Sequence, residues 1–186
     1  MARGVPSFDG PRLRAVRAGP KHGPVVQACL DAAPDYFERT EGRSAGPRAA
    51  ADLLADAEGD PDRRIYLLEP RGGGPAVGVL DLHLDYPEPG TAHIGLLLFR
   101  ESCQGMGYGK ETAAAVEAAL ARAGYRALRL SVTDENQDAH DFWSRVGFAE
   151  VGRLDRGVTV YEKPLGARLR PSLSGIPAVP HAGERS

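Results

Sequence analysis

The chain has 186 residues and a formal net charge of −2, with 23 lysines and arginines against 25 aspartates and glutamates. This length suits one domain with a sizeable core, and the charge balance lacks the basic excess typical of nucleic-acid-binding proteins. The sequence predicts neither a membrane span nor a secretory signal, because no apolar run is long enough. Cys29 and Cys103 lie too far apart for a metal-binding pair, so we expect no metal site and a reducing, cytoplasmic setting.

The first ninety residues predict a strand, two helices and a hairpin. The strands alternate apolar and polar residues, and the helices place apolar residues on one face. A loop with three consecutive glycines joins the two strands of the hairpin. The expected bounds are 12–17 for the strand, 24–33 and 48–57 for the helices, and 65–69 and 76–84 for the hairpin.

The stretch from Ile94 to Ala123 organises the rest of the chain. The apolar run 94–99 ends a predicted strand, Thr91–Phe99, and a polar loop and a glycine triplet follow it. A long alanine-rich run then predicts a helix that ends at Gly124. The first N–H groups of a helix have no internal partner, and a loop without side chains lets a phosphate approach them. Lys110 adds a cation there, so the stretch indicates either phosphate binding or an ordinary glycine turn.

Two familiar nucleotide-binding loops do not fit these glycines. A P-loop needs a glycine five residues before the Gly-Lys pair and a serine or threonine after it, and the chain has Gln104 and Glu111 there. A dinucleotide-binding loop needs G-x-G-x-x-G, whereas Gly105, Gly107 and Gly109 alternate.

The remaining elements complete one domain over residues 1–163. A strand at Ala127–Thr133, a helix at 138–146 and a closing hairpin with strands at 148–153 and 158–163 are predicted. Residues 164–186 hold four prolines and show no periodicity, so we expect a poorly ordered C-terminal tail.

Two blocks of the second half carry a family resemblance. Gln104-Gly105-Met106-Gly107-Tyr108-Gly109 fits Q/R-x-x-G-x-G/A and resembles the pyrophosphate loop of the GCN5-related N-acetyltransferases (GNAT), which bind acetyl-CoA. The segment from Asn136 to Phe148 is similar to that family's N-x-x-A-x-x-L-Y-x-K-x-G-F segment. The resemblance spans about 13–163 and implies an α/β fold with a mixed, mostly antiparallel sheet flanked by helices, whose strands part at the cofactor site.

The resemblance also implies where acetyl-CoA binds. It would lie between the strands 94–99 and Ala127–Thr133, with an N–H near Leu97 aimed at the thioester oxygen as an oxyanion donor. For Asn136, capping of the following helix is an equal alternative. The expected cofactor-binding residues are Leu96, Leu97, Leu98, Phe99, Gln104, Gly105, Met106, Gly107, Tyr108, Gly109, Lys110, Asn136 and Trp143.

Several polar residues are candidates for the general base. An amine acceptor is mostly cationic at neutral pH and must lose a proton before it attacks. The candidates beside the expected entrance for the acceptor are Asp81, His83, Asp85 and His93. The alternative is that they simply face solvent on a half-buried sheet. We favour His93, directly ahead of the oxyanion strand, and then Asp85.

The acceptor site is expected in the first half, which resembles a subgroup of small bacterial members of the family. Its predicted residues are Tyr36, Phe37, Glu38, Asp85 and Tyr86. Acidic residues near this entrance suit a cationic amine, and core packing is the alternative for Tyr36 and Phe37.

Trp143 departs from the family, which often has a tyrosine there as the acid that protonates the leaving thiolate. Indole N–H is a donor but no usable acid. A thiol with a pKa of about 8.5 is nevertheless a fair leaving group, so the departure weakens the assignment of an acid and leaves the activity possible. Cys103 shows no paired base in the sequence, which disfavours an acyl-enzyme thiol.

These patterns predict an N-acetyltransferase that moves acetyl directly from acetyl-CoA to an amine of a small molecule or peptide. One alternative is an acyl-CoA-binding sensor without turnover, and another is an enzyme that uses a different acyl group or an alcohol acceptor. We expect no nucleic-acid or membrane partner, and a monomer or homodimer.

Overall fold

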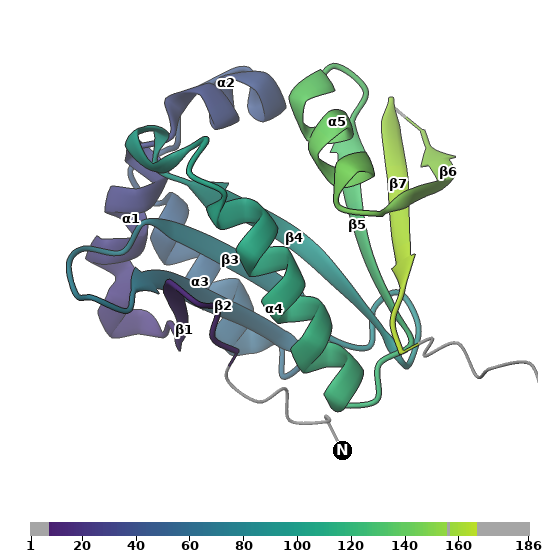
Figure 1. Ribbon diagram of the computed structural model, residues 1–186. Helices are drawn as coiled ribbons and strands as arrows, with labels where there is room; N and C mark the ends of the chain where they lie inside the picture. Colours follow the sequence, from purple (N-terminus) through teal and green to yellow (C-terminus); the bar gives the residue numbers. More distant parts are fainter. Residues whose placement is uncertain (1–7, 156, 167–186) are drawn as a thin grey trace, which may run out of the picture.

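The computed structural model describes residues 8–155 and 157–166, and these form a sheet with helices on both faces (Figure 1). The predictions for the N-terminal residues 1–7 and for most of the tail, 167–186, fall outside this range. The strands are β1 (Leu13–Arg17), β2 (Arg63–Pro70), β3 (Gly78–His83), β4 (Thr91–Phe99), β5 (Ala127–Thr133), β6 (Ala149–Leu154) and β7 (Val158–Pro164). The helices are α1 (Gly23–Asp31), α2 (Pro34–Glu41), α3 (Ala49–Gly59), α4 (Tyr108–Arg122) and α5 (Gln137–Arg145), with short 3-10 turns at Pro20–His22 and Glu101–Cys103.

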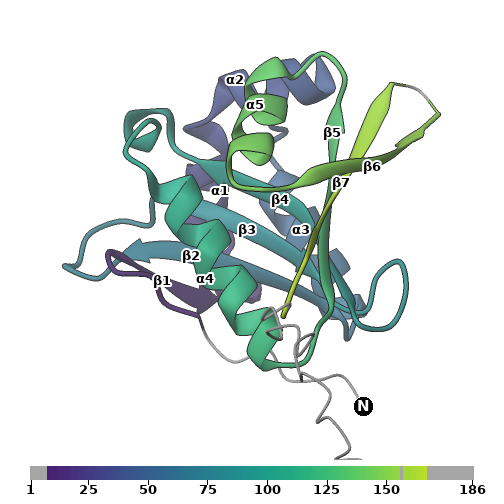
Figure 2. The ribbon, with the colours of Figure 1, turned by 45° about the vertical axis from the view of Figure 1, so that its right-hand side comes forward.

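The seven strands form one sheet in the order β1-β2-β3-β4-β5-β7-β6. All neighbouring strands are antiparallel except β4 and β5, which run parallel with α4 as their crossover (Figure 2). The predicted mixed, mostly antiparallel α/β fold is confirmed.

Each face of the sheet has its own apolar core. Leu80, Leu82 and Leu128 pack against α4 and α5 on one face. Val79, Leu67 and Leu98 pack against α1 and α3 on the other. Strand alternation explains this division, because Val79 and Leu80 are successive residues of β3 and point to opposite faces.

The parallel pair is short. Pairing between β4 and β5 runs from Thr91–Ala127 to Ile94–Leu130 and stops there, although both strands continue. The register between β3 and β4 also shifts at this point, because Asp81 pairs with Leu96 and Leu82 pairs with Ile94. Gly95 is therefore the extra residue of a β-bulge, which bends β4 away from β5.

In the part of the chain that the structure describes, no helix is long and apolar enough to cross a membrane.

The α4 face should dominate stability. Leu120 is fully buried between α4 and the sheet, whereas Leu154 at the end of β6 is 58% exposed. Leu120→Ala should lower the free energy of unfolding by about 2–5 kcal/mol, because it leaves a cavity. The matched change Leu154→Ala should cost less than about 0.5 kcal/mol. Urea denaturation of both variants checks this, and equal effects would contradict the assigned core.

Candidate functional site

A cavity of about 850 Å³ opens where β4 and β5 part. Its walls come from β4, the glycine loop, the start of α4, the end of β5, α5 and Tyr36 of α2. It brings together the residues that the sequence assigned to the cofactor, with Met106 as the exception: the Met106 side chain is 52% exposed and lies outside the lining.

The edge of β4 presents backbone groups to this cavity. Arg100 N–H donates to Val77 O at 2.9 Å, toward β3. Because successive N–H groups of a strand point in opposite directions, those of Leu97 and Phe99 point away from β3, into the space that β5 has left. The geometry thus agrees with an oxyanion donor at Leu97, although the assignment itself stays a prediction.

The glycine loop forms the floor of one end of the cavity. Gly105 and Gly107 have positive φ angles of 72° and 80°, and Gly107 is the residue that caps the start of α4. A Cβ at Gly109 would lie 3.0 Å from the Phe142 ring of α5, so the absence of a side chain lets α4 and α5 approach closely. The 15-residue helix α4 starts here with N–H groups that have no partner within the helix, and residues 107–110 at this end line the cavity.

Arg12 contacts both the glycine loop and the start of α4. Its Nη1 donates to Met106 O at 2.9 Å, its Nε pairs with Glu111 of α4 at 2.8 Å, and its guanidinium lies 4.6 Å from the centre of the Tyr108 ring. Burial raises the pKa of Glu111, but hydrogen bonds from the Arg12 main chain and side chain and from Leu13 N–H outweigh it and hold that pKa below its ordinary value. No motif pointed to Arg12, because it lies 99 residues from Glu111 along the chain.

On the α5 side, the cavity is lined by the amide of Asn136 and by aromatic side chains. Asn136 Oδ1 accepts from Ala139 N–H at 3.2 Å, so Asn136 caps α5, and it also lines the cavity; its contact with the cofactor stays a prediction. Trp143 is 7% exposed and packs edge-on against Phe142 and Phe148. Phe142, which the motif contains, lines the cavity as well.

The two favoured bases lie elsewhere. Asp85 sits in the turn at the far end of β4, where its carboxylate accepts from Gly90 N–H at 2.7 Å and from the Tyr125 hydroxyl at 3.3 Å. His93 points to the α3 face, 6.4 Å from the His83 ring, and does not line the cavity. Burial, followed by repulsion from His83, lowers the pKa of His93 to about 4. A ring with this pKa is neutral at pH 7 but holds an accepted proton weakly.

The residues expected to bind the acceptor lie in different parts of the structure. Tyr36 lines the cavity, Phe37 is buried in the α1–α3 core and Glu38 is exposed. Tyr86 is 54% exposed and its ring lies against His83 and His93.

An ion pair joins α2 to the α5 wall of the cavity. Arg39 of α2 pairs with Asp138 of α5, which lines the cavity, and α2 and α5 lie together at one end of the molecule in both views (Figures 1 and 2). Besides Lys110, Arg145 of α5 adds a cation to the lining. Sequence reasoning missed Arg39 because its partner lies 99 residues away along the chain, and it assigned no role to Arg145.

Among the described residues, no cluster of three or more His, Cys, Asp or Glu side chains could hold a metal ion.

Parallel strands that part over a glycine-rich helix start are the arrangement that the resemblance implied for an acyl-CoA site. The model of the acetyltransferase (GNAT) family matches residues 26–148, so the chain belongs to this family of acyl-CoA-dependent acetyltransferases.

Solved structures agree with this assignment. An acetyltransferase from Thermus thermophilus is 33% identical, with a TM-score of 0.76 over 83% of this chain and 97% of that one. A GCN5-related N-acetyltransferase from Brucella melitensis (18% identity, TM-score 0.70, 87% and 79% covered) shares the fold. So does a GNAT-family acetyltransferase from Bacillus anthracis (15%, TM-score 0.68, 85% and 98%). A search of curated proteins gives no match.

The contacts of Arg12 with the glycine loop predict an effect on CoA binding. Arg12→Met removes the bond to Met106 O, while Glu111 keeps two main-chain donors. A lost hydrogen bond of this kind is worth about 1 kcal/mol, so the Kd for CoA should rise about fivefold. Arg14→Met is the matched control, because Arg14 is similarly exposed and pairs with Glu69 of β2 instead. Calorimetric titration checks both, and equal affinities would contradict this role of Arg12.

The half-buried His93, with its lowered pKa, predicts a loss of stability in acid. The unfolded chain takes up this proton at an ordinary pKa of 6.5 and the folded chain only near 4, so stability falls as the pH falls through this window. Between pH 7 and pH 5 the loss is about 2 kcal/mol. Urea unfolding at pH 7 and pH 5 should show that His93→Gln loses less unfolding free energy than the natural protein, by about 2 kcal/mol. An equal loss in both proteins would contradict a neutral His93 ring in the folded state.

Proposed function

We propose that this protein is an N-acetyltransferase, which transfers acetyl from acetyl-CoA directly to the amine of a small molecule or peptide in a ternary complex. The observation that carries the proposal is the parting of β4 and β5 at Ile94–Leu130, with a cavity of about 850 Å³ between them.

The residues present fit CoA at three places. The free edge of β4 at Leu97 and Phe99 can pair with the amides of the pantetheine arm as a neighbouring strand would. The start of α4, with Gly105, Gly107 and Lys110, can hold the pyrophosphate. Asn136 and Trp143 close the opposite wall.

When bound, acetyl-CoA supplies an activated thioester, and the chain supplies the surroundings. A Leu97 N–H aimed at the thioester oxygen stabilises the negative charge that grows there as the amine attacks. Trp143, which lines the cavity and is 7% exposed, would exclude water from the bound thioester. It has no acidic proton to give, which matters little because a thiolate can leave and collect a proton from water.

The acceptor is proposed to be an amine, as the resemblance to N-acetyltransferases implies. Asp138 lines the cavity, where Arg39 pairs with it, and Asp35 and Glu38 are exposed on α2. Carboxylates on this side attract a cationic acceptor more than a neutral alcohol. The sensor alternative keeps one supporting observation, since no acid replaces the family's tyrosine at Trp143.

The glycine loop supplies the test of cofactor binding. Gly107→Val forces a β-branched residue to a φ of 80°, which displaces the loop. This variant should lose the rise in Tm that acetyl-CoA gives to the natural protein. Gly73→Val is the matched control: its φ is 87° and it lies in the hairpin loop outside the cavity lining.

Thermal denaturation with and without acetyl-CoA decides the point. Unchanged stabilisation of Gly107→Val would remove the loop from the site, and stabilisation by ATP in place of acetyl-CoA would overturn the proposal. Mass spectrometry of an amine panel with acetyl-CoA then separates enzyme from sensor, because only the enzyme yields acetylated products.

A further inference from the structure

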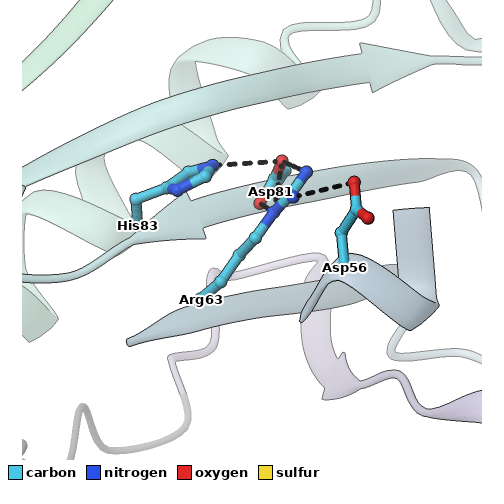
Figure 3. A network of polar contacts seen from close by, with 4 residues as sticks. All are labelled: Asp56, Arg63, Asp81 and His83. Atoms are coloured by element: carbon cyan, nitrogen blue, oxygen red, sulfur yellow. Dashed lines mark hydrogen bonds and ion pairs between the residues drawn. The ribbon is translucent and has the colours of Figure 1, made fainter. Parts of the chain in front are cut away.

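A buried charge network lies directly behind the β4 bulge. Asp81 of β3 is 3% exposed, and its carboxylate accepts from Arg63 of β2 at 2.7 Å (Nη2) and 3.1 Å (Nε) (Figure 3). Arg63 Nη1 also reaches Asp56 of α3, at 3.4 Å. On the other side of Asp81, His83 places its Nε2 3.4 Å from Oδ2.

The network keeps Asp81 ionised. Burial raises the pKa of Asp81, but hydrogen bonds from His83 and Arg63 outweigh it and hold the pKa below its ordinary value. An ionised carboxylate beside Nε2 fixes the proton of the neutral ring on that nitrogen, so Nδ1 becomes the atom that can accept a proton. This is the arrangement by which a carboxylate orients a catalytic histidine.

The His83 ring lies against Gly95, the residue of β4 at which β4 and β5 part. Gly95 is the first residue of β4 beyond the last pair with β5, and it lines the cavity. A Cβ on Gly95 would lie 2.9 Å from both Asp81 Oδ2 and His83 Nε2. These two side chains are therefore the nearest to a Cβ at Gly95, and any side chain at residue 95 would push them away.

We propose that His83, oriented by Asp81, is the general base that takes a proton from the acceptor ammonium. This rests on the proposed function. His83 and Asp81 do not themselves line the cavity, but Gly95, which does, lies against both. The His83 ring is 25% exposed, so an acceptor amine would reach it from the α3 face beside Gly95. Asp81 and Arg63 are positioning residues, and His93 remains a competing candidate.

The proton balance is simple. Nδ1 of neutral His83 accepts one proton from the ammonium, which becomes an amine with a free electron pair, and the ring becomes an imidazolium. The amine forms the C–N bond as the C–S bond breaks, with the bonding pair kept by sulfur. The second proton of the nitrogen and that of His83 pass to solvent, and the sulfur takes one proton from it.

Charged and titratable groups face His83 and its neighbour His93 from several elements. Burial, followed by repulsion from His83, lowers the pKa of His93 to about 4, so His93 holds an accepted proton weakly. The groups around His83 are Asp81 on β3, Arg63 on β2, Asp56 on α3 through Arg63, His93 on β4 and Tyr86 in the following turn, and Arg129 on β5 acts on His93.

The kinetic test compares His83→Gln with the natural protein on an alkylamine that the natural protein acetylates. General-base catalysis is typically worth about 10²–10⁴-fold, so kcat/KM at pH 7 should fall at least about 100-fold while the Kd for acetyl-CoA stays unchanged. The deficit should shrink as the pH rises toward the amine pKa, because the amine is then already deprotonated. A merely structural role would give a deficit independent of pH.

A second readout needs no turnover. In histidine-labelled protein without ligand, ¹⁵N NMR should show the neutral His83 ring protonated on Nε2. Asp81→Asn should lower the share of rings protonated on Nε2, because a neutral amide holds that proton less strongly than a carboxylate does. A ring protonated on Nδ1 in the natural protein, or a tautomer ratio unchanged in Asp81→Asn, would overturn the positioning by Asp81.

The outcomes separate the two proposals. If the natural protein acetylates no amine of the panel, the proposed function fails and the role of His83 falls with it. If the natural protein is active and His83→Gln keeps its kcat/KM, only the assignment of His83 fails. A loss confined to His93→Gln would transfer the role to His93.

Discussion

The structure depends on one interruption in its hydrogen bonding, where β4 and β5 stop pairing after Ile94 and Leu130. Buried backbone N–H and C=O groups need partners, so two neighbouring strands that separate inside a sheet are unfavourable unless something else occupies the gap. Here the gap leads to the start of α4, where further N–H groups lack partners within the helix. An elongated ligand with amides at one end and phosphates at the other would satisfy both sets.

The bulge at Gly95 links this gap to the opposite face of the sheet. It turns β4 away from β5, and its lack of a side chain leaves room for Asp81 and His83. Breaking one partner of the buried Arg63–Asp81 pair would leave an uncompensated charge, so the pair constrains β2 and β3 strongly. Local departures from regular structure of this kind concentrate at functional sites.

Most of the fold follows from the sequence, because its signals are local. Alternation and short apolar runs predicted every described strand to within a few residues, and Gly105, Gly107 and Gly109 placed the loop at the start of α4. The site could be predicted only where it follows from one continuous segment. Arg12 contacts Glu111, which is 99 residues away along the chain. Only the tertiary structure brings His83 against Gly95, where β4 and β5 part. It also leaves Asp85 in a distant turn and Phe37 in the core. Pairing register and bulges are set by such long-range contacts, which a residue pattern does not contain.

Amide hydrogen exchange resolved by NMR tests the central claim most directly, because it reports on the backbone groups of β4 themselves. The N–H groups of Leu97 and Phe99 point into the gap, whereas that of Leu98 pairs with β3. Addition of CoA should slow the exchange of Leu97 and Phe99 at least about tenfold relative to Leu98. Equal exchange of all three amides with and without saturating CoA would contradict the account that the parted strands form the acyl-CoA site.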